Sequence, residues 1–244
     1  MFSFFKKKPS RLPIDLSRLG VDMHSHLIPG IDDGAKTIDE SIAMLYKFQE
    51  LGYRRVITTP HTMSDYYKNT PEIILSGLEN VRAEARKIGL TIEIEAASEY
   101  YFDDLFMKKI GTEEILTFGG NHVLVEFAMR GVPLYENDMF FALIKNNYQP
   151  VLAHFERYMG FFGSVDKAKE YKDRGILIQM NLLSLTGHYG PEVKKQAERL
   201  VDAKLVDFAA TDCHRIDHLM LLEKHLSDEY FHKLLELELR NGEL

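Results

Sequence analysis

The chain has 244 residues, 45% of them hydrophobic, and a net charge of −7, so it can build one large globular domain with a substantial core. This acidic balance argues against a general nucleic-acid binder, which normally carries a basic face. The single cysteine, Cys213, excludes an internal disulfide and fits a reducing compartment. No window reaches the roughly 20 apolar residues that span a bilayer, and we expect a cytoplasmic protein.

Residues 1–19 are predicted to form an N-terminal extension that precedes a single domain over residues 20–244. The extension begins with phenylalanines at positions 2, 4 and 5, followed by three lysines. An apolar run that is this short and precedes the charges does not fit a signal peptide. The Phe/Lys head could touch an anionic membrane surface, but a frayed terminus is the simpler interpretation. We therefore expect no stable membrane insertion.

The first predicted strand runs into a segment with two histidines, His24 and His26. Side chains at i and i+2 of an extended segment point to the same face, so both imidazoles can reach one ion. Asp33 follows after a short loop. Imidazole suits zinc, iron or manganese, and added carboxylates shift the preference toward manganese or magnesium. A polar loop without metal is the alternative, unless other strands supply matching ligands.

Helices and strands alternate along the rest of the chain. A helix is predicted from Ile38, where Thr37 and Glu40 form a capping box, and its apolar spacing continues to Leu51 before Gly52. Further strands are predicted at residues 55–59, 90–97, 122–127, 150–153, 176–180 and 206–210, and further helices at 70–88, 103–110, 135–147, 165–174, 191–204 and 217–240. Seven strand-helix units without a linker predict one α/β domain built as a βα barrel.

Potential metal ligands recur at the ends of these strands. Chemistry in βα barrels collects at the C-terminal ends of the strands, and every predicted strand except the sixth ends in a residue of a metal-binding type. The candidates are His24, His26, Asp33, His61, Glu99, Glu126, His154, Asp212 and His214. Each could singly cap a helix or be hydrogen-bonded in the core. Their recurrence favours one convergent metal cluster.

The other histidines lack this placement. His122 begins a strand and is expected on the opposite face, and His188 lies in a loop flanked by glycines. His218, His225 and His232 are spaced by seven residues along the predicted last helix. We interpret these three as one solvated or packing stripe.

The strand-end segments resemble successive motifs of the PHP (polymerase and histidinol phosphatase) superfamily, and within it those of the CpsB/YwqE-type bacterial tyrosine-protein phosphatases. The segments are residues 22–26, 59–61, 97–99, 125–127, 153–158 and 211–214. Asp33 and Glu126 stand where other branches usually have histidine. The resemblance covers about residue 20 to at least residue 216 and implies an α/β fold, a distorted seven-stranded (β/α)7 barrel of PHP type.

The resemblance also implies up to three divalent metals, usually Mn²⁺, with Mg²⁺, Fe or Zn²⁺ as further possibilities. Carrying the motifs over assigns three sets of ligands: His24, His26, Glu99 and Asp212 to one ion; Glu99, Glu126 and His154 to a second; Asp33, His61 and His214 to a third. A carboxylate has two oxygens, so Glu99 can bridge two ions.

A metal cluster generates hydroxide near neutral pH and neutralises phosphoryl oxygens. Arg157 is the best candidate to hold a phosphate oxygen; an ion pair with Glu156 or another acid at the rim is its structural alternative. Arg215 is a second candidate, because the family often has another phosphate-binding arginine downstream. A phenolate with a conjugate-acid pKa near 10 leaves without a strong general acid, and none is assigned. Aromatics in or near the same loops could stack on a phenyl ring, although packing is their more usual role; they are Tyr66, Tyr67, Tyr100, Tyr101, Phe155 and Tyr158.

The resemblance implies a metal-dependent protein-tyrosine phosphatase that acts on a bacterial tyrosine autokinase controlling capsule or exopolysaccharide synthesis. Hydrolysis of a small phosphate monoester such as histidinol phosphate, a nuclease, and a non-catalytic domain that binds a tyrosine-phosphorylated protein remain as alternatives. Cysteine-dependent phosphatases need an arginine six positions after the cysteine, and here Leu219 follows Cys213 at that distance. The sequence leaves the oligomeric state open.

Overall fold

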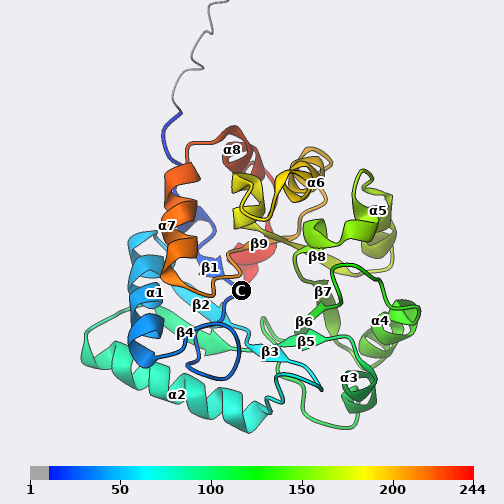
Figure 1. Cartoon of the computed structure of the whole chain (residues 1–244), viewed down its shortest axis with the longest axis horizontal. Coiled ribbons are helices and arrows are strands. Elements are labelled where there is room, and N and C mark those ends of the chain that lie inside the picture. The colour runs from blue at the N-terminus through cyan, green and yellow to red at the C-terminus, as the bar shows by residue number, and fades with distance from the viewer. Residues whose placement is uncertain (1–10) are drawn as a thin grey trace, which may run out of the picture.

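The computed structural model describes residues 11–244, so the Phe/Lys-rich head lies outside the described residues. Two runs of parallel strands, in the orders β1-β2-β4 and β3-β5-β6-β7-β8-β9, curl around a common centre (Figure 1). Their bounds are β1 Val21–Asp22, β2 Arg55–Thr58, β3 His61–Thr62, β4 Glu93–Ala96, β5 Glu99–Tyr101, β6 His122–Glu126, β7 Gln149–Leu152, β8 Leu177–Asn181 and β9 Phe208–Ala210. This is the predicted α/β class with parallel strands.

Helices cover the outside of the curled sheet (Figure 1). They are α1 Ile38–Glu50, α2 Pro71–Lys87, α3 Asp104–Lys109, α4 Glu136–Lys145, α5 Asp166–Asp173, α6 Pro191–Asp202, α7 Ile216–His225 and α8 Glu229–Leu235. Short 3₁₀ turns stand at η1 Leu16–Arg18, η2 Phe155–Arg157, η3 Met159–Phe161, η4 Leu182–Thr186 and η5 Arg240–Glu243. Among residues 11–244, no helix combines the length and apolar character needed to cross a membrane.

The helix ends follow the local sequence signals. At the start of α1, Thr37 Oγ1 accepts from Glu40 N at 3.3 Å, as the capping box predicts. The Glu40 carboxylate accepts from Lys36 N at 2.7 Å, one residue earlier than in the standard box. Along α2 the predicted apolar face is buried as far as Ala85, but Ile88 is 57% exposed because it lies beyond the last helical turn.

The two outer ends of the sheet meet beside the segment that follows β1. His26 N donates to Cys213 O at 2.9 Å, and Asp212 N donates to His24 O at 2.9 Å. The buried Asp22 carboxylate accepts from Thr211 N at 2.7 Å, and burial raises the pKa of Asp22 to about 7. These bonds bring the residues after β9 against those after β1.

Two predicted strands are each interrupted near their C-terminal ends. Pro60 cannot donate a ladder hydrogen bond, and it separates β2 from β3; Ala97 and Ser98 separate β4 from β5. After both breaks the chains pair again, with His61 in register with Glu99. The prediction of one strand over residues 90–97 is therefore wrong in its bounds, and Glu99 belongs to a separate strand.

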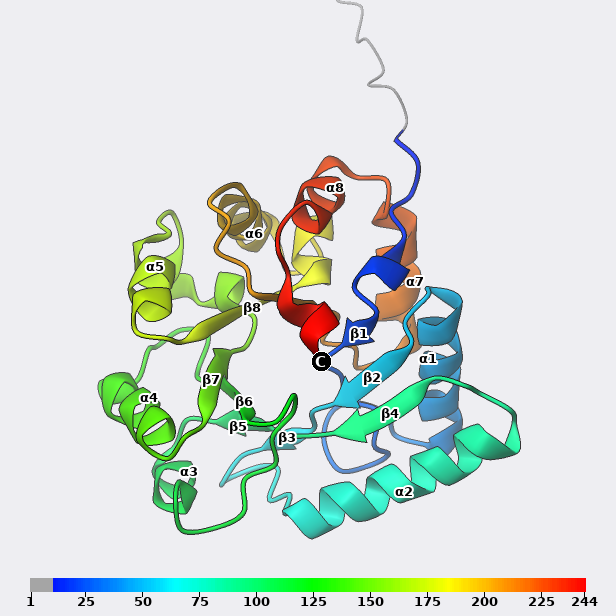
Figure 2. The ribbon, with the colours of Figure 1, turned by 180° about the vertical axis from the view of Figure 1, so that it is seen from behind.

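The C-terminal residues close the end of the sheet opposite the strand C-termini. Asn241 Nδ2 donates to Val21 O at 3.0 Å and to Ala209 O at 2.8 Å, so η5 bridges β1 and β9. Figure 2 shows the C-terminus at the centre of the molecule on this side. The C-terminal ends of the strands are not covered by η5, and a site can form there.

Residues 217–240 are mostly helical, as predicted, but they form two helices, α7 and α8, instead of one continuous helix. The chain breaks between α7 and α8, where Asp228 N bonds His225 O at 2.9 Å and the Asp228 carboxylate lies 2.8 Å from His225 Nδ1. Residues 11–19 pack beside this break: Ile14 N donates to Leu226 O at 2.9 Å. The domain boundary at residue 20 stays a prediction.

Candidate metal centre

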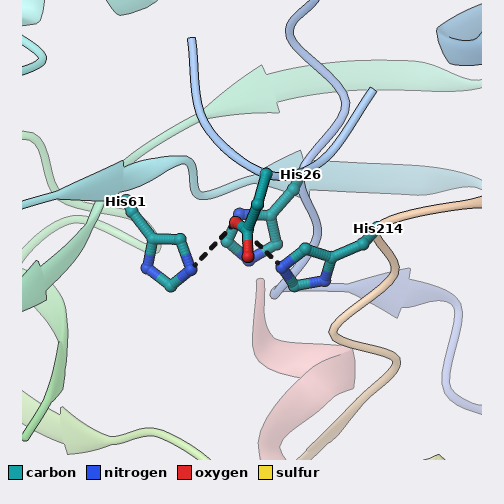
Figure 3. Close-up of side chains that lie close together, drawn as sticks. His26, His61 and His214 are labelled. Carbon is teal, nitrogen blue, oxygen red and sulfur yellow. Dashed lines mark ion pairs between the residues drawn. The ribbon is translucent and has the colours of Figure 1, made fainter. Parts of the chain in front are cut away.

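The side chains predicted at the strand ends converge on one centre at the C-terminal ends of the strands. Three groups have nitrogen and oxygen atoms within 4.8 Å of one another: His26 with Asp33, His61 and His214; His24 with His26 and Asp212; and His61 with Glu99 and Glu126. Figure 3 shows the imidazoles of His26, His61 and His214 gathered around one point. Of the nine predicted residues, only His154 lies outside these groups, and it contacts Glu99 directly.

Glu99 stands at the middle of the cluster. Its Oε2 lies 3.1 Å from His24 Nε2 and 3.1 Å from His61 Nδ1, and its Oε1 lies 2.9 Å from His154 Nε2. The carboxylate is fully buried. Burial alone would raise the pKa of Glu99, but the charges of His24 and His61 and a hydrogen bond from His154 hold it well below its usual range. The two oxygens therefore face different groups of ligands.

Asp212 also divides its two oxygens. Oδ1 lies 3.3 Å from His24 Nε2 and 3.3 Å from His26 Nε2, whereas Oδ2 accepts from Arg157 Nη1 at 3.0 Å and from Asn181 Nδ2 at 2.7 Å. Fixing the second oxygen of a ligand in this way orients the first toward the ion. Asp212 can therefore offer Oδ1 to a metal while Oδ2 stays within the protein.

His61 lies between two groups. Its Nδ1 is 3.0 Å from Glu126 Oε1, and its Nε2 is 3.5 Å from Asp33 Oδ1. The resemblance placed His61 with Asp33 and His214 and placed His154 with Glu99 and Glu126. The structure also brings His61 against Glu126, which reaches it across β5, the strand between β3 and β6.

Two of the predicted ligands have a strained backbone. His154 and Asp212 have φ of 34° and 51° and are two of the four non-glycine residues with positive φ among residues 11–244. Such conformations persist where the surroundings enforce them and are enriched at functional sites. Each residue lies two positions after the last residue of a strand, β7 or β9, and the left-handed turn directs its side chain toward the centre.

The sequence interpretation missed Asp32. Its Oδ2 lies 2.7 Å from His26 Nδ1 and accepts from His61 N at 3.1 Å. An acceptor on Nδ1 fixes the tautomer that leaves Nε2 free to bind an ion. Asp33, by contrast, is half exposed and faces His61 and His214. The tandem aspartates were the available signal, but the sequence does not reveal which one faces the centre.

The sixth predicted strand, now β8, contributes amides instead of ligands. Gln179 Oε1 lies 3.1 Å from His24 Nδ1 and accepts from His154 N at 2.8 Å. Gln179 Nε2 donates to Asn181 Oδ1 at 2.9 Å, and Asn181 in turn bonds Asp212. The period-2 alternation of Gln179 and Asn181 with Ile178 and Met180 was the sequence signal.

Arg157 lies at the edge of the cluster, in η2. Its ion-pair partner is Asp212 and not Glu156, which is buried and accepts from Asn181 N at 3.0 Å. The ring of Tyr189, which the sequence interpretation also missed, has its centroid 4.4 Å from Arg157 Cζ. One quarter of the arginine side chain is exposed, so a ligand at the rim can reach it.

Arg215 lies on the same rim but outside the cluster. It is exposed, precedes α7 and makes no ion pair with the described residues.

Burial, His214 and Arg215 lower the pKa of His218 to about 4, and His218 Nδ1 lies 3.4 Å from His214 N. His218 therefore has a packing role, one of the two roles predicted for the three histidines, and it is buried beside the centre.

Cys213 and several aromatics are core residues. Cys213 is fully buried, as predicted, and burial raises the pKa of its thiol well above the usual range. Tyr100, Phe155 and Tyr158 are also buried in the hydrophobic core, so for these three the packing role applies, in the core and not at the rim. Tyr67 does stack on His61, with ring centroids 5.6 Å apart. His122 lies at the other end of β6, against Phe118 and Phe208, as predicted.

The donor set fits divalent cations. Imidazole nitrogens and carboxylate oxygens together suit manganese, iron and zinc, and Glu99 and Asp212 are buried beside imidazoles, with Arg157 next to Asp212. Burial alone would lower the pKa of His24, but Glu99 and Asp212 raise it to about 9. Glu99 and Glu126 similarly raise the pKa of His61 to about 10. In the metal-free protein, protonated imidazoles balance the negative charge of the carboxylates, which a bound metal ion would otherwise balance.

We expect manganese binding to release protons. At about pH 7.5, both His24 and His61 are protonated in the metal-free protein because their pKa values lie above that pH, and only unprotonated nitrogens bind metal. Loading the chain should release at least about two protons, measured by calorimetric titration in buffers of different ionisation enthalpy. His61→Gln should release about one fewer, and His122→Gln should match the wild type. Release near zero would contradict this.

A curled parallel sheet with imidazoles and carboxylates gathered at the C-terminal ends of its strands is the arrangement of metal-dependent hydrolases built on βα units. Residues 20–234 match the family model described as capsular polysaccharide synthesis, CpsB/CapC. The chain belongs to this CpsB/CapC family.

Individual relatives agree along almost the whole length. CapC of Staphylococcus aureus is 31% identical over 232 residues, covering 92% of this chain and 90% of the relative. The tyrosine-protein phosphatase YwqE of Bacillus subtilis is 28% identical over 233 residues, covering 91% and 92%. A solved structure from work on YwqE and on CpsB of Streptococcus pneumoniae, described as unique metal-dependent tyrosine phosphatases, superposes with a TM-score of 0.77 at 28% identity, covering 91% of this chain and 94% of that one.

Proposed function

We propose that this chain is a metal-dependent protein-tyrosine phosphatase of capsule or exopolysaccharide synthesis. The buried cluster centred on Glu99, with Arg157 at its edge, carries the proposal. Relatives that share nearly the whole length of the chain are named tyrosine-protein phosphatases. The domain of residues 20–244 is one unit, preceded by the extension of residues 1–19.

The fold within this proposal is a distorted (β/α)7 barrel of PHP type. Counting β2 with β3 and β4 with β5 as interrupted strands leaves seven positions around the centre, in chain order. The hydrogen bonds from His26 N to Cys213 O and from Asp212 N to His24 O support closure between the last position and the first.

The proposed site holds up to three divalent ions, with manganese as the resident metal. The first ion is assigned to His24, His26, Glu99 and Asp212, the second to Glu99, Glu126 and His154, and the third to Asp33, His61 and His214. The two differently directed oxygens of Glu99 support its role as a bridge between the first and second ions. His61, assigned to the third ion, contacts Glu126, assigned to the second ion, so the second and third sites are adjacent.

Bound ions supply a water-derived nucleophile near neutral pH and counter-charge for phosphoryl oxygens. Around them, Asp32, Gln179 and Asn181 hold His26, His24 and Asp212 in the orientation that binding requires. Arg157 then binds an equatorial phosphate oxygen and stabilises the charge that develops on it. Arg215 is assigned a weaker contact at the rim. The phenolate of phosphotyrosine leaves without a dedicated acid, because its conjugate-acid pKa is near 10.

The substrate in this proposal is a tyrosine-phosphorylated protein, a bacterial tyrosine autokinase that controls polysaccharide export. The half-exposed Asp33 and the partly exposed Arg157 support a reacting centre that is open to the surface, so that a side chain on a flexible segment can enter it. The one cysteine fits the reducing cytoplasm as the place of action.

A substrate comparison tests the proposal. Metal-stripped protein is assayed before and after manganese addition on a phosphotyrosyl peptide, a phosphoseryl peptide and histidinol phosphate. Manganese-dependent turnover of the phosphotyrosyl peptide, with little on the other two, is expected. Preference for histidinol phosphate would keep the metal centre but replace the substrate class. Phosphopeptide binding without turnover by the manganese-loaded protein would instead make the chain a binding domain.

A further inference from the structure

The loop between η4 and α6 places Tyr189 against Arg157, and the proposed function does not use this tyrosine. The 4.4 Å between Arg157 Cζ and the centroid of the ring is a cation–π distance. Gly187 and Gly190 flank the pair His188-Tyr189 with φ of 86° and 101°, values that glycine adopts without strain. The backbone turns at both glycines, and Tyr189 lies between these turns, beside Arg157 at the rim of the metal centre.

The guanidinium of Arg157 is thus held from two directions. Nη1 donates to Asp212 Oδ2 at 3.0 Å along one edge, while the ring of Tyr189 lies over the guanidinium carbon. Among residues 11–244, Asp212 is the only hydrogen-bond acceptor for this group. A guanidinium has five N–H donors, so several remain for an incoming anion.

We propose that Tyr189 is a positioning residue that fixes the plane of the Arg157 guanidinium, so that its free N–H groups are ready to bind a phosphate at the metal centre. The proposal rests on the proposed function, because that function assigns phosphate binding to Arg157. An unrestrained arginine side chain loses considerable rotamer freedom when it binds, and the ring reduces that loss in advance. Burial raises the pKa of the Tyr189 hydroxyl, so a neutral ring makes this contact near pH 7.

A double-mutant cycle tests the proposal. With manganese and a phosphotyrosyl peptide, Tyr189→Leu should lower kcat/KM roughly 3- to 30-fold, the range of a cation–π contact. In the Arg157→Ala background, the same substitution should cost less than about twofold, because a residue that acts through another has no effect once that other is removed. Tyr189→Phe, which keeps the ring, should stay within about twofold of the wild type.

Tyr230→Leu provides a matched control. The Tyr230 ring lies 4.3 Å from Lys233 Nζ on the surface of α8, so this variant removes a similar contact far from the centre and should leave kcat/KM unchanged. Melting temperature and bound manganese are measured for every variant, and Tyr189→Met replaces Tyr189→Leu if the latter does not fold. An equal loss in both Arg157 backgrounds, or a Tyr189→Phe variant as impaired as Tyr189→Leu, would overturn the proposal.

A binding measurement separates this proposal from the proposed function. Calorimetry with inorganic phosphate and manganese-loaded protein should give a higher Kd for Tyr189→Leu than for the wild type, and no such difference in the Arg157→Ala background. If this pattern appears without peptide hydrolysis, Tyr189 keeps its role and the phosphatase assignment fails. If the peptide is hydrolysed but the Kd for phosphate is the same in the wild type and in Tyr189→Leu, the phosphatase assignment stands and the proposed role of Tyr189 is wrong.

Discussion

Glu99→Gln should nearly abolish metal-dependent turnover. The substitution keeps the shape of the side chain but removes the charge that faces His24, His61 and His154, and an amide bridges two ions poorly. Metal catalysis contributes several kcal/mol to transition-state stabilisation, so we expect kcat/KM on a phosphotyrosyl peptide to fall on the order of 10³-fold. The variant should also retain fewer manganese ions per chain, measured by elemental analysis after gel filtration.

Glu95→Gln is the matched control for this change. Glu95 lies four residues earlier, on β4, where its partly exposed carboxylate is 3.4 Å from Arg55 Nη1. Removing one partner of such a surface pair typically costs less than about 1 kcal/mol of stability and should leave metal content and turnover unchanged. A Glu99→Gln enzyme with full metal content and near wild-type turnover would remove Glu99 from the proposed centre.

Arg157→Ala should lower kcat/KM roughly 10²- to 10³-fold while the bound metal is largely retained. The expected size is that of removing one preorganised donor to a developing charge. The loss should exceed that of Tyr189→Leu, because Tyr189 only positions the guanidinium. Arg157→Lys should recover only part of the activity, since an ammonium keeps the charge but not the planar paired donors. Steady-state kinetics alongside elemental analysis makes the comparison.

Arg174→Ala controls for the loss of a positive charge. Arg174 follows α5 and has its Nη1 3.5 Å from Glu170 Oε1 on the surface, so its removal should leave kcat/KM within about twofold of the wild type. If Arg157→Ala loses manganese in proportion to its activity, the ion pair with Asp212 would be the main function of Arg157, and its assigned contact with phosphate would be wrong.

Local sequence patterns predicted the order of helices and strands well. The capping of α1 by Thr37 and the start of α2 at Pro71 follow from short-range rules. The patterns did not predict that pairing resumes after the interruptions at Pro60 and at Ser98, because the pairing of His61 with Glu99 joins segments that are distant in sequence. The break before Asp228 was missed for a simpler reason: the helical spacing of apolar residues continues across it.

The residue types at the strand ends determined which side chains gather, since parallel strands in a curled sheet bring their C-terminal ends together. Only the tertiary structure decided how they face one another. It placed Asp32 and not Asp33 behind His26, because the loop turns between them. It also set Glu126 against His61 as well as against His154, although β5 lies between the strands that carry His61 and Glu126.

The sequence by itself therefore determined the class of fold and the chemistry of the centre, because hydrophobic periodicity and ligand type are properties of short segments. The tertiary structure decided the supporting residues. Gln179, Asn181 and Tyr189 act through residues that are distant in the chain, and amides and a tyrosine carry no local signal of that use. Their roles depend on the curling of the sheet, which brings β8 and the loop before α6 beside His24, Asp212 and Arg157.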